Sequence, residues 1–208
     1  MLSKRLKLIA SFVDTDNIVD VGCDHALLDI FLTKQGKKCI ASDISNEVLK
    51  KACENIKKYH LEKEIEVVQS DGLKNITLKE NSTVVIAGMG THTIINILKN
   101  ANHNNITNLI IQSNNDLYLL RKYVTSIGYY IEREASVLDN NKYYVIIKFK
   151  KGQKKYKKKD YLFGNLDKKY YEFLINKNNE ILKHLKLKHF RKKIKLLKEN
   201  HLLKQKLR

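Results

Sequence analysis

The first 150 residues alternate between short runs of apolar, β-branched residues and longer stretches in which apolar residues recur every three or four positions. The short runs predict buried strands, and the longer stretches predict helices that cover them. Strands are expected at Ile18–Val21, Lys38–Ser42, Ile65–Gln69, Val84–Ala87 and Leu109–Gln112. Helices are expected at Lys4–Phe12, Ala26–Lys34, Glu47–Tyr59, Thr93–Lys99 and Leu117–Ile127. Strands that alternate with helices are typical of a doubly wound parallel sheet.

Two further apolar runs, Tyr130–Leu138 and Tyr143–Phe149, flank the turn-forming residues 139–141, which read Asp-Asn-Asn. This pattern predicts an antiparallel hairpin at the end of the sheet. The expected fold is therefore α/β and Rossmann-like, with a mostly parallel seven-stranded sheet. This layout resembles that of the class I methyltransferases.

The pattern changes in the last third of the chain. Residues Lys150–Lys159 read as a linker by composition, and a heptad-like repeat of apolar residues follows them. Its positions are Leu187, Phe190, Ile194, Leu197 and His201, with an upstream stripe at Tyr170, Leu174, Ile181 and Leu185. Such a spacing predicts a helical hairpin of coiled-coil type. We therefore expect two domains, residues 1–152 and 153–208.

Charge separates the same two parts. The chain has 208 residues, a net charge of +18, no Pro or Trp, and 35 Lys against 5 Arg, so biased codon usage accounts for part of the excess. Residues 1–150 nevertheless carry 20 basic and 17 acidic side chains, whereas residues 151–208 carry 20 basic and 5 acidic ones. A block with a net charge of +15 predicts a polyanionic partner for the C-terminal part.

Other features narrow the class of protein. Apolar runs are too short for a transmembrane helix, and the N-terminus lacks the pattern of a signal peptide. The three cysteines, Cys23, Cys39 and Cys53, do not have the spacing of metal ligands, and their odd number favours reduced thiols. We expect a cytoplasmic protein with neither a membrane segment nor a metal site.

Polar residues at the ends of the first two strands point to a nucleoside cofactor. Asp20 and Gly22 end the first strand, and Asp43 ends the second, 21 residues beyond Gly22, about where a ribose-binding carboxylate is expected. A loop with a single glycine suits a pyrophosphate poorly. S-adenosylmethionine (SAM) has no phosphate, and Asp20 could accept a hydrogen bond from its amino group. The alternatives are an ordinary strand-to-helix turn and, for Asp43, a helix N-cap.

Later strand ends carry weaker signals of the same kind. Asp71-Gly72 follows the third strand, where an acid can accept from an adenine amino group, although Asp-Gly is also a common turn. Glycines flank Met89 after the fourth strand, which lets a ligand approach the backbone. The amides of residues 112–115 suit a base edge, or else cap the next helix. His25 is either a structural residue or one that lies near the base.

The segments DVGCDHALL (20–28), IAGMG (86–90) and QSNN (112–115), with the basic helical tail, resemble the TrmK family of bacterial tRNA (adenine-N1)-methyltransferases, which act at tRNA position 22. The resemblance covers nearly the whole chain. Three positions depart from the family pattern. Asp29 and Ser113 stand where Pro is usual, and Thr91 stands where a third glycine is usual.

The resemblance implies a SAM-dependent methyltransferase domain followed by a helical domain. It implies an adenine of the tRNA D-arm as the target, tRNA phosphates on the C-terminal domain, and a monomer. Methylation of another RNA and a non-catalytic SAM- or RNA-binding module remain alternatives. The implied cofactor contacts are Asp20, Gly22, Asp43, Ile44, Asp71, Gly72, Ala87 and Gly88, and the implied catalytic, base-facing residues are Asp24, His25, Met89 and Asn114.

Overall fold

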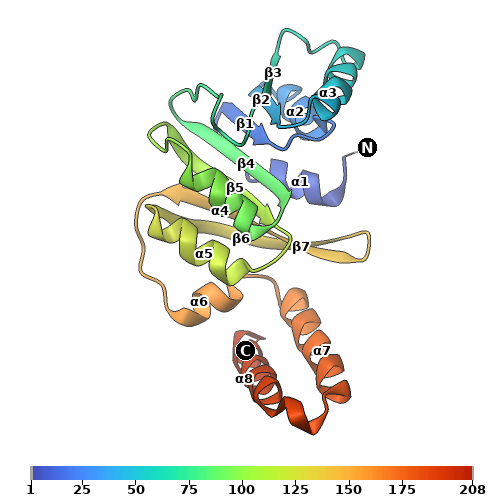
Figure 1. Cartoon of the computed structure of the whole chain (residues 1–208), viewed down its shortest axis with the longest axis vertical. Helices are drawn as coiled ribbons and strands as arrows, with labels where there is room; N and C mark the ends of the chain where they lie inside the picture. The colour runs from blue at the N-terminus through green and yellow to red at the C-terminus, as the bar shows by residue number, and fades with distance from the viewer. Residues whose placement is uncertain (1, 208) are drawn as a thin grey trace. The chain divides into compact units, whose positions relative to one another are not determined.

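The computed structural model describes residues 2–207, except for the side chain of Leu187. It contains two compact units, which divide between Lys155 and Tyr156. The first unit is a seven-stranded sheet with helices on both faces, and the second is a small group of helices (Figure 1). No helix in the described part of the chain is both long and apolar enough to cross a membrane.

The sheet has the strand order β3-β2-β1-β4-β5-β7-β6. Strands β1 to β5 run parallel, and β7 pairs antiparallel with both β5 and β6. The predicted parallel sheet with a terminal hairpin is thus confirmed. The strands are β1 (Asn17–Val21), β2 (Lys38–Asp43), β3 (Ile65–Gln69), β4 (Ser82–Met89), β5 (Ile106–Ser113), β6 (Tyr129–Asp139) and β7 (Lys142–Lys151).

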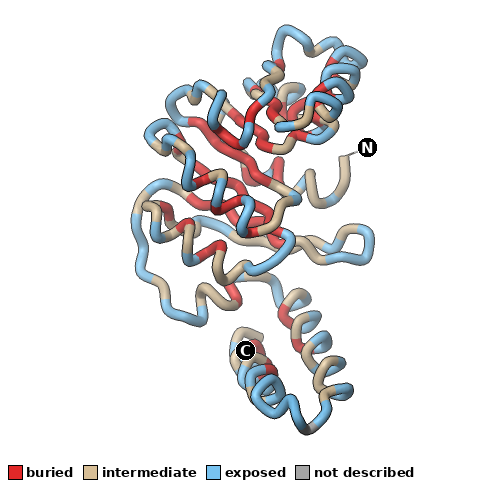
Figure 2. The backbone as a smooth tube through the Cα atoms, in the orientation of Figure 1, coloured by how far each residue is buried: buried red, intermediate tan, exposed pale blue. Residues whose placement is uncertain are grey.

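Helices α1 to α3 supply apolar side chains to a core on one face of the sheet, and α4 and α5 lie over the face turned to the viewer in Figure 1. The central strands are buried along most of their length (Figure 2), as expected of a parallel sheet covered on both faces. No helix separates β3 from β4. The helices are α1 (Lys4–Ala10), α2 (Leu27–Thr33), α3 (Asn46–Lys58), α4 (Thr91–Lys99) and α5 (Leu117–Ser126).

The hairpin between β6 and β7 has the predicted two-residue turn. Asn140 and Asn141 both have positive φ, 49° and 59°, as a type I′ turn requires. The expected linker, in contrast, is shorter than its composition indicates. Lys150 and Lys151 still belong to β7, and Lys158 already belongs to α6.

The second unit consists of α6 (Lys158–Phe163), α7 (Lys168–His184), the 3-10 turn η1 (Leu187–His189) and α8 (Phe190–Leu207). Helices α7 and α8 form the predicted hairpin. Its small core contains Phe163, Tyr171, Ile175 and Leu203.

The stripe predicted on α7 packs within the hairpin, whereas the seam predicted on α8 is displaced by about one residue. Phe190 and Leu197 are 64% and 51% exposed, whereas Leu196, Asn200 and Leu203 are buried. Asn200 occupies the seam because its amide donates to Asn179 Oδ1 and accepts from Asn178 Nδ2, both at 2.9 Å. On α7 the fully buried residues are Tyr171 and Ile175, and the predicted Tyr170 and Leu174 are half-buried and pack against the same core. The side chain of Leu187, also in the predicted seam, lies outside the described residues.

Candidate active site

A hollow of about 390 Å³ lies at the carboxyl ends of β1, β2 and β4, where open α/β sheets bind their ligands. Its volume is in the range of small-molecule sites. Residues from α1, from the loop between β1 and α2, and from the ends of the three strands surround it. The lining residues are Arg5, Leu6, Asp20, Gly22, Cys23, Asp24, His25, Leu27, Leu28, Asp43, Ala87, Gly88 and Met89.

Eight of the twelve residues expected at the site line this hollow. They are Asp20, Gly22, Asp24, His25, Asp43, Ala87, Gly88 and Met89. Four expected residues do not line it, namely Ile44, Asp71, Gly72 and Asn114. The structure therefore brings the β1, β2 and β4 ends together and leaves the segment after β3 outside the hollow.

Gly22 shapes the floor of the hollow. Its backbone N–H donates to Ser42 O at 2.8 Å, and that of Cys23 donates to the same oxygen at 3.0 Å. These bonds tie the loop after β1 to the end of β2. Gly22 has a φ of +78°, and a Cβ atom there would collide with the terminal methyl of Met89. Glycine is thus favoured by the backbone conformation, and any larger residue would also make the end of the Met89 side chain shift.

The loop that follows Gly22 is strained. Asp24 and Ala26 both have left-handed backbone conformations, with φ of 52° and 53°. Such conformations are costly for residues other than glycine and cluster at functional sites. They expose the Asp24 side chain, which is 78% accessible and lies 3.6 Å from His25 Nε2. The amide of Asn55 donates to His25 O at 3.0 Å and holds the loop against α3.

Asp20 is the buried acid of the site, with 5% of its surface exposed. Burial raises the pKa of its carboxyl to about 7, and the charges of Asp43 and Asp24 act in the same direction. A hydrogen bond to Asp29 and the positive charge of Arg5 lower this pKa. The Asp20 carboxyl is consequently part protonated at neutral pH, and a cation beside it would favour the ionised form.

Asp43 is not the N-cap of α3. That position belongs to Ser45, whose hydroxyl accepts from Val48 N at 3.4 Å. One carboxylate oxygen of Asp43 accepts from Ser45 N at 3.0 Å. The neighbouring Ile44 is 65% exposed, and its carbonyl accepts from Gln69 Nε2.

Asn114 lies beside the hollow, at the ends of β4 and β5. Its side-chain amide donates to Gly88 O at 2.6 Å, and its backbone N–H donates to Met89 O at 2.9 Å. Gln112 Nε2 donates to Asn114 Oδ1 at 3.2 Å, which fixes the orientation of the amide. Asn114 is therefore held firmly next to two residues that line the hollow.

Arg5 is a site residue that sequence reasoning missed. Its guanidinium donates to Gln112 Oε1 at 2.9 Å, and its backbone N–H donates to Asp139 Oδ2 at 3.0 Å. A hydrogen-bonded chain thus runs from Arg5 through Gln112 and Asn114 to Gly88. No local pattern predicts this role, because α1 is far in sequence from the strands it meets. One signal was available, since only five Arg remain among 35 Lys.

The segment after β3 has another arrangement. Asp71 is exposed and its carboxylate pairs with Lys74 Nζ at 2.6 Å. Gly72 has a φ of +64°, and a Cβ atom there would approach Ile97 of α4 to 3.0 Å. Gly72 thus allows this segment to pack closely against α4.

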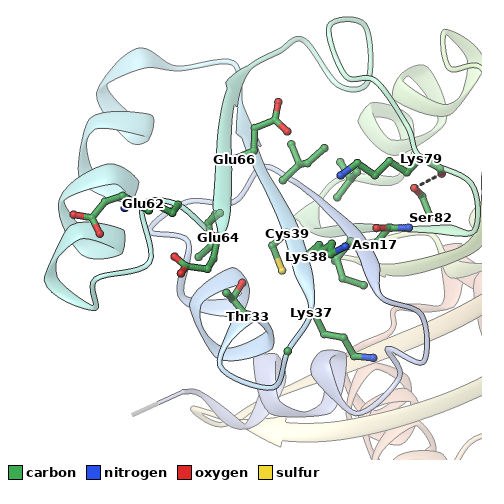
Figure 3. Close-up of a pocket in the computed structure, with 16 residues that line it drawn as sticks. Asn17, Thr33, Lys37, Lys38, Cys39, Glu62, Glu64, Glu66, Lys79 and Ser82 are labelled. Carbon is green, nitrogen blue, oxygen red and sulfur yellow. Dashed lines mark hydrogen bonds between the residues drawn. The ribbon is translucent and has the colours of Figure 1, made fainter.

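A larger hollow, of about 670 Å³, lies at the amino ends of β1, β2 and β3 (Figure 3). Both basic and acidic side chains line it, among them Lys37, Lys38, Glu64 and Glu66. None of the residues expected at the site lines it. Among the described residues, no cluster of His, Cys, Asp or Glu could hold a metal ion.

Comparison with known proteins agrees with this geometry. A family model described as a methyltransferase domain matches residues 2–147. A Mycoplasma genitalium protein that is proposed by its name to be a tRNA methyltransferase is 33% identical over 163 residues, which are 75% of this chain and 73% of that protein.

Solved structures resemble the whole chain. A Streptococcus pneumoniae protein, proposed by its title to be a tRNA (m1A22) methyltransferase, has a TM-score of 0.90 and 29% identity, with 100% of both chains covered. TrmK of M. capricolum, in complex with S-adenosylhomocysteine, has a TM-score of 0.84 and 28% identity, with 100% of this chain and 98% of that chain covered. The chain therefore belongs to the methyltransferase family, and within it to the TrmK group.

Proposed function

We propose that the protein transfers a methyl group from SAM to N1 of the adenine at position 22 of tRNA. The observation that carries this proposal is the acidic hollow at the ends of β1 and β2, bordered by the Gly88-Met89 segment. Relatives that cover the whole chain support it, since one is solved with SAM and proposed to be a tRNA (m1A22) methyltransferase.

The residues of the hollow suit SAM chemically. Asp20, Asp24 and Asp43 face it against a single Arg, so the hollow favours a ligand that carries positive charge. Asp20 would accept from the amino group of the methionine end, and Asp43 would accept from the vicinal hydroxyls of the ribose. The positive φ of Gly22 brings the backbone close to the ligand without a side chain in between.

Bound there, SAM supplies a methyl group that is already activated by its positively charged sulfur. Adenine N1 has a free lone pair near neutral pH, so no strong base is needed. The chain's own residues must orient the adenine and stabilise the positive charge that the base acquires. Asn114, whose amide is oriented by Gln112 and Gly88, would hold the exocyclic amino group. In this proposal the Asp24 carboxylate would stabilise the positive charge, and His25 and Met89 would lie beside the base.

The target atom lies on the Watson–Crick edge, so the base must leave its stack at a cost of a few kcal/mol. Contacts to the rest of the tRNA must offset that cost. The second unit can supply them, because residues 156–208 carry 17 basic and 5 acidic side chains, a net charge of +12. One hollow of this unit has an apolar floor and a basic rim. The basic residues around it are Lys158, Lys159, Arg191, Lys195 and Lys198.

The decisive experiment is methyl transfer from labelled SAM to an unmodified tRNA, followed by mapping of the methylated nucleotide. We expect one 1-methyladenosine, at position 22, and no transfer to a matched tRNA with guanine there. Methylation of a different nucleotide, or of another RNA only, would replace the proposed substrate. SAM binding without transfer to any RNA would favour a non-catalytic module.

A further inference from the structure

A second buried acid lies against Asp20. Asp29, in the first turn of α2, is completely buried, and neither of its carboxyl oxygens makes a hydrogen bond of good geometry with a donor among the described residues. Its own backbone N–H is near enough to lower the pKa of the carboxyl, but burial outweighs this effect. The polar group that it meets is the carboxyl of Asp20. Unpartnered buried carboxyls are rare, because burial of an unpaired charge is expensive. The contact between these two acids therefore needs a physical explanation.

A shared proton supplies this explanation. Two carboxylates cannot hydrogen-bond to each other, so one of the two acids must be protonated for the contact to be favourable. Burial and the neighbouring charge of Asp20 raise the pKa of Asp29 well above its usual range, and the contact with Asp20 raises it further. The same contact lowers the pKa of Asp20. Asp29 is consequently the donor of the pair, and Asp20 is the acceptor.

We propose that Asp29 is a positioning residue of the cofactor site: its protonated carboxyl donates a hydrogen bond to the Asp20 carboxylate and holds it ionised and oriented for the cofactor's amino group. This inference rests on the proposed function, because it assigns Asp20 to a cationic group of the ligand. Asp29 does not line the hollow and acts only through Asp20.

The surroundings of the pair fit this assignment. Asp20 is influenced from α1 by Arg5, from β2 by Asp43 and from the loop by Asp24. The two thiols influenced by Asp29, Cys23 and Cys39, stay protonated at neutral pH because burial raises their pKa, that of Cys39 to about 12. Neither thiol can therefore supply a second negative charge. At neutral pH Asp29 keeps its proton, and the fraction of Asp20 that is still protonated near its pKa of about 7 loses its proton as the cofactor binds.

The affinity for the cofactor should then fall on both the acid and the alkaline side of an optimum pH, which gives its pH profile an acid limb and an alkaline limb. Below about pH 7 it falls because Asp20 becomes protonated, and above about pH 8 it falls because the α-amino group of the ligand loses its charge. Only the acid limb depends on Asp29. A change confined to that limb separates positioning of Asp20 from general damage to the fold.

The test is calorimetric titration of the full chain with SAM and with S-adenosylhomocysteine, from about pH 5.5 to 8.5, a range that brackets the titration of Asp20. The variants are Asp29→Leu, which removes the donor and keeps the branching at Cγ, and Asp29→Asn, which keeps a donor that cannot ionise. We expect Asp29→Leu to weaken binding at pH 7 by about tenfold or more, the worth of one hydrogen bond to a charged acceptor. Its acid limb should move to higher pH.

Asp29→Asn should restore binding to within about twofold of the wild type at every pH, as expected when only the donor matters. Wild-type binding near pH 6.5 should also release a proton, measured in buffers of different ionisation enthalpy. Equal binding by wild type and Asp29→Leu, or an acid limb that Asp29→Asn moves to lower pH, would overturn the proposal.

A readout without ligand separates this proposal from the proposed function. The infrared C=O band of a protonated carboxyl should persist in the ligand-free wild type at about pH 8.5, above the titration of Asp20, and should be absent there from Asp29→Asn. If the band is missing, Asp29 is ionised and the inference fails. If the band is present but neither SAM nor S-adenosylhomocysteine binds at any pH, the proposed function fails instead.

Discussion

The hydroxyl oxygens of Thr91 and Ser113 lie 2.8 Å apart, between the start of α4 and the end of β5. Both are buried, and both also bond to Asn115 O, at 2.6 Å and 2.9 Å. These are two of the three positions at which the chain departs from the pattern of its family. Because the two hydroxyls bond to each other and to Asn115 O, they hold the backbone on both sides of Asn114, and we expect them to do the work of the proline that the TrmK resemblance implies at position 113.

Thr91→Val should destabilise the protein by about 1–2 kcal/mol, since it removes a buried hydroxyl with two strong partners at constant volume. Urea unfolding of Thr91→Val, Ser113→Ala and the double variant should show a coupling of about 0.5–1.5 kcal/mol between the two positions. If the losses of stability in the two single variants simply add up in the double variant, the two hydroxyls do not act together. Their hydrogen bonds then do not stand in for a proline at position 113.

Gly22→Ala should cost more than Gly36→Ala. Both glycines have positive φ, +78° and +85°, so each substitution carries a backbone penalty of about 1–2 kcal/mol. A Cβ atom at Gly36 meets no atom within 4 Å, whereas one at Gly22 collides with Met89. Only Gly22→Ala should therefore weaken SAM binding in calorimetry, because Met89 must move. Equal SAM affinity in the two variants would show that Met89 can shift freely.

Asp24→Ala should leave SAM binding intact but lower the methyl-transfer rate by about a hundredfold, as loss of one group that stabilises transition-state charge does. The measurement is single-turnover transfer to tRNA with the cofactor saturating. Asp16→Ala is the matched control, because Asp16 is similarly exposed, at 81%, and pairs with Lys37 before β1, at the other end of that strand. Unchanged turnover in Asp24→Ala would exclude the proposed role.

The fold could be predicted closely from the sequence because its signals are local. The strand ends at Asp43 and Gln69 and the turn at Asn140-Asn141 depend on neighbouring residues alone. The seam of α8 could not be predicted in the same way. A heptad reading assigns Asn200 to the solvent face, and only the facing asparagines of α7 make its burial favourable.

The candidate site shows the same limit. Residues at strand ends, such as Asp20 and Gly88, could be predicted because the topology of a parallel sheet brings those ends together. Arg5 and Asp29 could not, since each acts through a tertiary contact that leaves no periodic trace in the sequence. Asp71 fits the strand-end pattern as well as Asp43 does, yet its carboxylate pairs with Lys74 outside the hollow.

Replacement of Lys158, Lys195 and Lys198 by Gln should weaken tRNA binding and reduce the dependence of its affinity on salt. If each Lys neutralises one phosphate, the slope of log affinity against log salt should fall by about 0.7–0.9 per Lys. Filter binding over a range of salt concentrations measures both effects. The control is the same substitution at three exposed lysines of α3, Lys50, Lys57 and Lys58. Equal losses of tRNA affinity in both variants would mean that these three lysines contact tRNA no more than lysines elsewhere on the chain do.

The ligand-free protein should lose stability as the pH rises from about 4 to about 7. The pKa of Asp20 is raised to about 7 in the folded chain, whereas an unfolded Asp titrates near 3.9. The folded state therefore binds more protons than the unfolded state within this window, so the free energy of unfolding decreases with pH.

Asp20→Asn removes this contribution, because the amide does not titrate. Urea unfolding of wild type and Asp20→Asn at pH 5 and at pH 8 isolates the effect, since every other titrating group is common to both proteins. We expect the variant to gain stability over the wild type between pH 5 and pH 8, because ionised Asp20 is buried with only Arg5 and Asp29 to offset its charge. A difference that stays constant with pH would mean that the Asp20 carboxyl is ionised throughout the range and that burial does not control it.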